Sequence, residues 1–396
     1  MDLQAQGVIS SLQSLVMNNR KLLSIVVPTK DRYKYLKYLI ELIASFNSDE
    51  VELVIQDNSE DNKEILDFLK ERDYNFVRYD YHKGQLPMSV NSDRAVLNSS
   101  GEYICFLGDD DGVTKYIIEG AHWMKDNNVE ATKLMVPAYY WPDASQGLGV
   151  SQSAVMTYYK YDGNVTFLSP QKELFKVLKD GIPNRGDMPL AYHSIVSREA
   201  MDKVYQICGS YFPGNSPDIA NAVALSLVVK RYALVNLPWV ISGYCVFKGG
   251  GVGAPGKKYP PEISDMPWFR PDAEEKWYKR IPRIAVGETI WPESAIQSLL
   301  AMQRKDLIKM VNFNKMYARF YMQRPSLRYL LNDVGGNTLG MKCAYYKMII
   351  KKYWNALWRR IGWMLNIGKP LSVFNINTII EAQIKLEEMA DCKHIF

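Results

Sequence analysis

The chain has 396 residues, of which 47% are hydrophobic and 23% charged, a composition typical of folded proteins rather than of disordered chains. Its 48 Lys and Arg residues exceed its 43 Asp and Glu residues by only five, and a net charge of +5 does not indicate nucleic-acid binding. The length allows two or three domains. The 26 Tyr and 9 Trp residues suit contact with carbohydrate or a membrane interface, and equally an aromatic core.

Three features of the sequence indicate the cellular context. The five cysteines are scattered and include no Cys-x-x-Cys pair, which is typical of a reducing cytoplasm and predicts no structural zinc. The first 20 residues lack the basic and apolar regions of a secretory signal, and their apolar spacing predicts a lead helix over 1–20. The longest apolar run, 219–229, is about half of what a membrane span needs. We therefore expect a cytoplasmic protein that is soluble or lies on a membrane surface.

Strand and helix patterns alternate between residues 22 and 107. Apolar, β-rich runs predict strands at 22–27, 51–55, 76–79 and 103–107. Helices are expected between them with apolar stripes at 35–43, 65–69 and 90–97, the first capped by Asp31 and the last stopped by Gly101. This alternation predicts a doubly wound α/β half-domain that binds a nucleotide.

The fourth predicted strand ends in Gly108 and three consecutive carboxylates, Asp109, Asp110 and Asp111. Ligands of open α/β sheets bind beyond the carboxyl ends of the strands. Adjacent carboxylates repel one another unless a cation or a hydrogen-bonding ligand neutralises them, and hard oxygen ligands select Mg²⁺ or Mn²⁺. The alternative is a solvated acidic turn.

Three stretches in this order resemble the family 2 glycosyltransferases of the GT-A fold. They are SIVVPTKDR at 24–32, VIQDNSED at 54–61 and SGEYICFLGDDD at 100–111, the last containing the DxD spacing. The resemblance covers residues 22–125 well and weakens towards 245. It departs from the family at the helix before 100–111, where the usual Asn is replaced by Asp93 with Asn91 nearby, and neither receives a role. Gly108 stands where the family often has Asp.

The resemblance implies a nucleotide-diphosphate sugar donor, with UDP first among the nucleotides. Pro28 and Thr29 would edge the base, and Asp57 would accept a hydrogen bond from a base N–H. The alternative for Asp57 is an Asx turn with Asn58 and Ser59.

The resemblance also assigns the acidic stretch. Asp109 would contact the ribose or a metal-bound water and share in the metal site. Asp111 would ligate Mn²⁺ or Mg²⁺, and Asp110 would take part in either task. A metal there would act as a Lewis acid on the departing diphosphate. Positive charge near the phosphates would come from side chains that are equally well explained as solvated surface bases: Arg32, Lys83 and Arg94.

A general base is expected about a hundred residues after the DxD in similar inverting enzymes. The Pro/Gly loop at 211–219 delivers Asp218 to the start of an apolar helix, whose N-terminus would keep the carboxylate ionised. The alternative is that Ser216 or Asp218 simply caps that helix. Asp187 is the second candidate base, and His193 beside Tyr192 is a candidate for the acceptor site or a packed histidine.

The Gly-rich segment at 248–262 could close over a diphosphate, with Lys248, Lys257 and Lys258 meeting the phosphates, or could be a linker. No Gln-x-x-Arg-Trp motif is present. In related processive synthases that motif holds the polymer, so we expect single addition.

Helical patterns dominate from 263 onward, with helices expected at 294–311, 314–322 and 343–365. Between Asp333 and Glu381 the sequence has no acidic residue, while Trp354, Trp358 and Trp363 are interleaved with Lys and Arg. Such a helix suits an anionic membrane surface. It would equally suit packing on a second subunit, in a homo-oligomer, or on the catalytic domain.

The sequence thus predicts a lead helix at 1–20, a GT-A domain at 21–247, a flexible loop at 248–262 and a helical region at 263–396. The GT-A domain divides into a nucleotide-binding half at 21–125 and an acceptor half at 126–247. The predicted activity is inverting, metal-dependent, non-processive transfer of a sugar to a saccharide acceptor, lipid-linked, in bacterial surface-polysaccharide assembly at the cytoplasmic face of the inner membrane.

Two other functions remain open. A sugar nucleotidyltransferase shares the α/β architecture but should carry a Gly-rich phosphate loop after the first strand, where residues 28–32 contain no glycine. A non-catalytic saccharide- or membrane-binding protein would not need the intact carboxylates. A dinucleotide oxidoreductase is disfavoured because no G-x-G-x-x-G follows the first strand.

Overall fold

The structure is a computed structural model that describes residues 20–146, 152–246, 262–364 and 368–389. The predicted lead helix at 1–20, but for residue 20, and nearly all of the Gly-rich segment at 248–262 lie outside these residues. The Lys248, Lys257 and Lys258 predictions therefore lie outside them as well.

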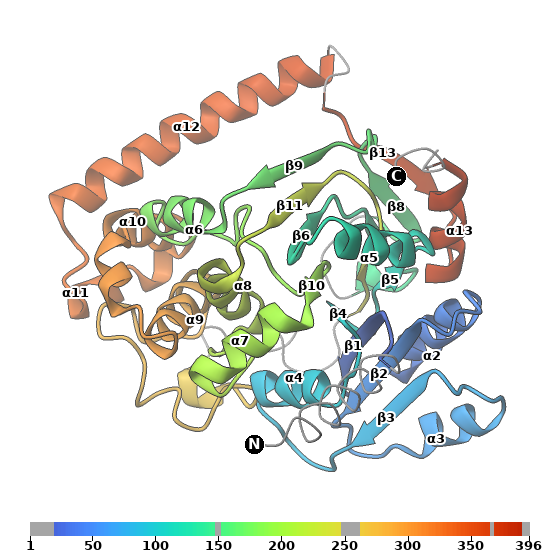
Figure 1. The fold of residues 1–396 in the computed structure, drawn as a ribbon. Coiled ribbons are helices and arrows are strands. Elements are labelled where there is room, and N and C mark those ends of the chain that lie inside the picture. The colour runs from blue at the N-terminus through green and yellow to red at the C-terminus, as the bar shows by residue number, and fades with distance from the viewer. Residues whose placement is uncertain (1–19, 147–151, 247–261, 365–367, 390–396) are drawn as a thin grey trace, which may run out of the picture.

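A mixed sheet forms the centre of the α/β part (Figure 1). Its strands lie in the order β3-β2-β1-β4-β10-β6-β11-β9, and the first four pair in parallel. Their bounds are β1 Leu23–Thr29, β2 Val51–Asp57, β3 Val77–Tyr81, β4 Tyr103–Phe106, β6 Ala131–Leu134, β9 Val165–Leu168, β10 Ile195–Ser197 and β11 Tyr232–Val235. The parallel block places the ends of β1, β2 and β4 at one edge, where the predicted site residues follow.

A second sheet has the order β13-β8-β7-β12-β5. Its strands are β5 Gly112–Val113, β7 Ala138–Tyr140, β8 Val155–Tyr158, β12 Val240–Tyr244 and β13 Leu371–Phe374. Strand β5 directly follows the acidic stretch and pairs with β12, which carries residues from much later in the chain to the end of β4.

Helices connect and cover these sheets (Figure 1). They are α2 Tyr33–Ala44, α3 Lys63–Lys70, α4 Met88–Leu97, α5 Tyr116–Asp126, α6 Pro170–Lys179, α7 Arg198–Cys208, α8 Pro217–Val228, α9 Gly287–Ala301, α10 Phe313–Gln323, α11 Leu330–Asp333, α12 Leu339–Met364 and α13 Ile379–Met389. Short 3-10 turns lie at Ala144–Gln146, Ile263–Asp265, Lys305–Met310 and Pro325–Leu327. In the described part of the chain, no helix combines the length and apolar character needed to cross a bilayer.

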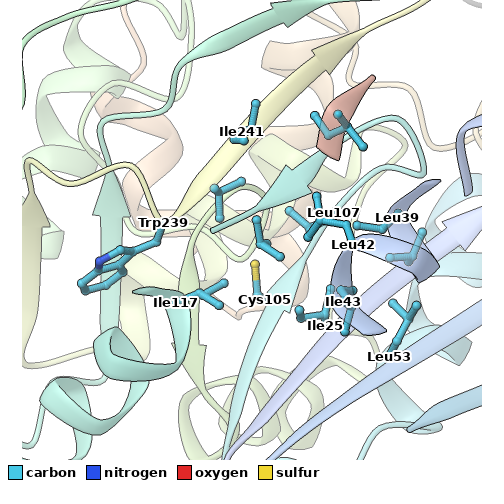
Figure 2. Close-up of a cluster of buried hydrophobic side chains, with 14 of the residues drawn as sticks. Ile25, Leu39, Leu42, Ile43, Leu53, Cys105, Leu107, Ile117, Trp239 and Ile241 are labelled. Carbon is cyan, nitrogen blue, oxygen red and sulfur yellow. The ribbon is translucent and has the colours of Figure 1, made fainter. Parts of the chain in front are cut away.

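The nucleotide-binding half is built as its apolar spacing predicts. Strands β1 and β2 are almost wholly buried, and α2 buries Leu36, Leu39 and Ile43 against them. Figure 2 shows this core extending from Leu53 on β2 to Trp239 just before β12. Burial of this apolar surface is the main contribution that fixes the strand ends in place.

The region after 262 does not form a core of its own. Leu174 of α6 and Val223 of α8 belong to the same apolar cluster as Ile296 of α9 and Phe320 of α10. The helical region therefore extends the core of the acceptor half.

The mainly helical C-terminal region also contains a strand that the sequence did not predict. β13 pairs antiparallel with β8, and α13 then packs beside α2, with Ile379 against Leu42 and Gly112. The chain therefore returns to the α/β part of the structure after α12.

Local predictions need three corrections. Asp31 does not cap α2, which begins after Arg32; its own φ is 55° and its carboxylate accepts a hydrogen bond from the Glu60 backbone N–H. Helix α4 ends before Gly101, whose Cα instead lies against the backbone of Ser24. The helix predicted at 294–311 is α9, which begins at 287 and ends at 301.

Candidate active site

The acidic stretch forms a tight turn immediately after β4. The backbone N–H of Gly108 donates to Asp111 Oδ2 at 2.7 Å, which folds the turn back on its own start. Asp109 and Asp111 are buried, at 3% and 1% exposure. This is not the solvated acidic turn of the alternative interpretation.

Residues at the end of β1 and just after it contact the first two carboxylates. Thr29 Oγ1 donates to Asp109 Oδ2 at 2.6 Å. Arg32 reaches both neighbours, with Nε 3.0 Å from Asp109 Oδ1 and Nη2 2.8 Å from Asp110 Oδ1. The ion pairs of Arg32 thereby connect the end of β1 to the turn after β4.

The third carboxylate is held by residues from far along the chain. His193 Nε2 lies 2.7 Å from Asp111 Oδ2, and the backbone N–H of Gly243 on β12 donates to Asp111 Oδ1 at 2.8 Å. His193 itself has a φ of 60°, a left-handed conformation that costs energy for a residue with a side chain. The left-handed backbone conformation of His193 therefore accompanies the contact of its imidazole with Asp111.

Gly243 also fixes the backbone of the turn. Its Cα lies so close to the Asp110 carbonyl oxygen that a Cβ would come within 1.7 Å of it. The same carbonyl accepts a hydrogen bond of 2.9 Å from Trp141 Nε1. Two elements outside β4 thus hold Asp110 in place.

The electrostatics of the turn reflect burial and the closeness of like charges. Burial raises the pKa of Asp109 and of Asp110 above the usual range, and Arg32 opposes that rise in both. Each carboxylate also raises the pKa of the next, because adjacent negative charges repel. Oxygen donors with unmet negative charge suit Mg²⁺ or Mn²⁺. No preassembled set of three His, Cys, Asp or Glu side chains able to hold a metal occurs in the described ranges.

Tyr192 stands between the acidic turn and the predicted base. Burial raises the pKa of Tyr192 well above its usual value, and the charges of Asp111 and Asp218 raise it further. Its ring stacks on His193 with centroids 3.8 Å apart. Tyr192 therefore lies within the electrostatic reach of both predicted catalytic groups.

Asp218 occupies the first turn of α8, as the sequence predicts. The preceding Ser216 is the N-cap residue, but neither forms a side-chain capping hydrogen bond. Asp218 Oδ2 lies 3.3 Å from Arg185 Nη1, and the side chain is 32% exposed. The Arg185 guanidinium in turn stands 5.9 Å from the Tyr192 ring centroid. The carboxylate is thus accessible and not consumed by capping.

Asp187 is placed differently. Its side chain is 53% exposed and pairs with Lys133 at 2.7 Å. Its backbone carbonyl accepts a hydrogen bond from the Tyr232 hydroxyl. These contacts anchor the loop before β10 to β6 and β11.

Asp57 is fully buried and surrounded by hydrogen-bond donors from the protein itself. The hydroxyls of Tyr33 and Tyr79 each donate to Oδ2 at 2.6 Å. The backbone N–H and hydroxyl of Ser59 donate to Oδ1 at 2.8 and 2.6 Å. A carboxylate offers about four acceptor sites, so a base N–H would have to replace one of these donors. The Asx turn of the alternative interpretation is present.

The other predicted binding residues lie around this edge. Pro28 and Thr29 end β1 as expected. Lys83 is exposed in the segment between β3 and α4, and Arg94 is half-buried on α4. Asp93 accepts hydrogen bonds from Ser210 and from the Tyr211 backbone N–H, so it secures the loop that precedes α8.

Sequence reasoning missed three residues of this site. They are Trp141, Gly243 and Cys245, whose Sγ lies 3.0 Å from Arg32 Nη2. No sequence motif identifies them, because each contacts a residue that is distant in the sequence.

Part of the chain is similar to a known protein family. Residues 24–177 match the model of glycosyl transferase family 2. Comparison with curated protein sequences gives no match.

Crystal structures of S. aureus TarS are similar to the chain at low identity. The match to TarS 1-349 in complex with UDP-GlcNAc has 16% identity, covers 83% of this chain and 92% of that one, and has a TM-score of 0.48. The complex of TarS 1-349 with UDP gives 15% identity, 83% and 91% coverage and a TM-score of 0.44. Against the structure titled simply TarS, the match has 14% identity and a TM-score of 0.41, and covers 56% of this chain but only 36% of that one.

The matched region begins with β1 and contains the acidic turn, so the family model and the geometry concern the same residues. Residues 24–177, about two fifths of the chain, are thus similar to glycosyl transferase family 2, and this match supports a glycosyltransferase activity.

Proposed function

We propose that the protein transfers a sugar from a nucleoside diphosphate sugar to a saccharide hydroxyl, with inversion at the anomeric carbon. The observation that carries this proposal is the arrangement of the acidic turn 109–111. It contacts Thr29 and Arg32 at one side, and the charges of both Asp111 and Asp218 raise the pKa of the neighbouring Tyr192. A donor site and a base on separate elements are what a direct displacement needs.

In this reaction Asp218 accepts the proton of the acceptor hydroxyl. The acceptor oxygen forms a bond to the anomeric carbon while the bond from that carbon to the diphosphate oxygen breaks. The electron pair leaves with the nucleoside diphosphate, and the proton stays on Asp218. Arg185, 3.3 Å from that carboxylate, would orient it towards the acceptor hydroxyl.

The leaving diphosphate requires positive charge. Asp111, with Asp109 beside it, would hold Mn²⁺ or Mg²⁺, and His193 lies close enough to Asp111 to share in that task. Such an ion would stabilise the charge that develops on the diphosphate. Arg32 already stands between Asp109 and Asp110 and would contribute a fixed cation at the same edge.

We assign the nucleotide to the ends of β1 and β2, with UDP as the first donor to test. Pro28 and Thr29 would edge the base. Asp57, held by the hydroxyls of Tyr33 and Tyr79, would position it. Lys83 and Arg94 lie on the segments that flank this edge. For the acceptor we propose a lipid-linked saccharide in bacterial surface-polysaccharide assembly at the cytoplasmic face of the membrane. Addition is single, because the sequence lacks Gln-x-x-Arg-Trp.

The test is a thermal-shift panel of UDP, GDP, ADP, CDP and TDP, each with and without Mn²⁺. We expect one nucleotide to raise the Tm, more strongly with Mn²⁺, since a ligand that binds only the folded state stabilises it. Asp111→Asn should remove the Mn²⁺-dependent part. A panel in which no nucleotide shifts the Tm would contradict the proposal. Release of pyrophosphate from a nucleoside triphosphate and a sugar phosphate would instead identify a nucleotidyltransferase.

A further inference from the structure

Helix α12 has two faces of different character. Its inner face carries Met341, Ala344, Tyr345 and Met348, which pack on α10 and the core of the helical region. Beyond residue 350 almost every described side chain of the helix is exposed. Figure 1 shows α12 lying along one side of the molecule, with α10 and α11 beside its first turns only. The helix therefore continues well past the core that holds it.

The outer face is a continuous apolar and aromatic stripe. Its members are spaced by about one or two helical turns, twice as adjacent pairs, which places them on one side of a helix. Tyr353 is 72% exposed, Trp354 59% and Trp358 55%. The stripe consists of Leu339, Tyr346, Ile350, Tyr353, Trp354, Leu357, Trp358, Ile361 and Met364. A run of large apolar side chains of this length, open to solvent, indicates an interaction surface.

The charges beside the stripe are all of one sign. α12 carries six basic and no acidic residues, namely Lys342, Lys347, Lys351, Lys352, Arg359 and Arg360. Towards the inner face, a groove of about 590 Å³ lies between α10 and α12, and Lys347, Lys351 and Lys352 line it together with Lys315 and Arg319. Asp180, the one acidic residue of this lining, already pairs with Lys315 at 2.7 Å. The surface therefore favours an occupant with an apolar layer and a negatively charged layer.

We propose that the outer face of α12 docks the protein on a bilayer that contains anionic phospholipid. Aromatic and aliphatic side chains of the stripe would enter the boundary between headgroups and acyl chains. The flanking Lys and Arg side chains would meet the lipid phosphates. Association of two copies through this face would bring two helices that carry basic but no acidic residues against each other, so charge repulsion disfavours it. This inference does not depend on the transfer reaction.

Vesicle flotation of the full chain tests the proposal. One vesicle population contains phosphatidylcholine alone and the other phosphatidylcholine with phosphatidylglycerol. We expect binding to the anionic vesicles that weakens as salt concentration rises. The triple variant Ile350→Ser, Trp354→Ser, Trp358→Ser should reduce that binding to background. The triple variant Lys347→Gln, Lys351→Gln, Arg360→Gln should weaken it about a hundred-fold, at about five-fold for each charge.

The matched control is Tyr329→Ser, which replaces an aromatic residue that is 62% exposed outside α12 and should bind as the original chain does. All variants replace exposed side chains, so equal Tm values are expected and would verify folding. Equal binding to both vesicle populations, or full binding by the stripe variant, would overturn the proposal. A dimer in sedimentation that disappears in the stripe variant, without vesicle binding, would assign the face to a second copy instead. Donor hydrolysis without vesicles should be unchanged in the α12 variants, so a failure of docking is separable from a failure of the proposed reaction.

Discussion

The Cα of Gly243 lies against the carbonyl oxygen of Asp110, with no room for a methyl group between β12 and the acidic turn. We predict that Gly243→Ala displaces the turn and lowers transfer activity at least about a hundred-fold, because small errors of position are costly for catalysis. Stability should fall by about 1–3 kcal/mol, as in other overpacked sites. Steady-state kinetics and urea unfolding measure the two effects. Gly287→Ala is the matched control, since open space surrounds that position, and it should change neither quantity.

Replacing Asp218 and replacing Asp187, the two candidate bases, should have opposite effects on turnover. Asp218→Asn should leave Mn²⁺-dependent nucleotide binding intact and lower turnover by about 10²–10⁴-fold, the usual contribution of a general base. Asp187→Asn should retain near-normal turnover, because that carboxylate is exposed and pairs with Lys133. The measurement is kcat together with nucleotide affinity for each variant. Near-normal turnover of Asp218→Asn would reject the assignment and make Asp187 the next residue to test.

Asp57 should contribute to stability apart from any role with the base. Asp57→Ala leaves two buried tyrosine hydroxyls and the Ser59 donors without their acceptor, which we expect to cost about 2–4 kcal/mol of unfolding free energy. Urea unfolding provides the measurement. Glu60→Ala, an exposed neighbour, serves as the control and should change stability by less than about 0.5 kcal/mol. If the two variants were equally stable, the carboxylate would be available mainly to ligands.

Glu293 should make the protein less stable as the pH rises. Burial raises the pKa of Glu293 to about 7, whereas a Glu in the unfolded chain titrates near about 4.3. The folded chain therefore binds more protons between these values, and the free energy of unfolding falls as pH rises from about 4.3 to about 7. Below that window stability is not reduced by this group, and above it the reduction is complete at about 4 kcal/mol.

Glu293→Gln removes this ionisation. Urea unfolding at pH 5 and pH 8 should show a smaller decrease in stability for the variant than for the original chain. Glu275→Gln, at an exposed position, should keep the original pH dependence. An identical decrease in all three proteins would mean that Glu293 titrates with the same pKa in the folded and unfolded chains, which would contradict the prediction.

The nucleotide-binding half was predictable because its signals are local. Apolar runs mark β1, β2 and β4, and the acidic stretch directly follows the last of them. The contacts of Arg32 with Asp109 and Asp110 follow from the parallel pairing of β1 with β4, which brings both strand ends to one edge.

The rest of the site depends on contacts across the whole chain. Gly243 reaches the turn only because β12 pairs with β5, and His193 does so through a strained backbone conformation that no spacing reveals. β13 was missed for a similar reason. Its four residues are mostly exposed and gain their hydrogen bonds from β8, so the segment carries no burial pattern of its own.

The packing of α13 on α2, where Ile379 and Leu42 lie in one apolar cluster, can form only late in synthesis of the chain. A ribosome releases the chain from its N-terminus, so α2 and the strands around it emerge long before α13 does. Until then, the apolar groups that α13 covers remain open to solvent and β8 lacks its outer partner. Contacts between such distant residues close late and slow the final step of folding. We therefore expect that a chain halted before α13 would stay dependent on chaperones, even with every residue of the acidic turn already made.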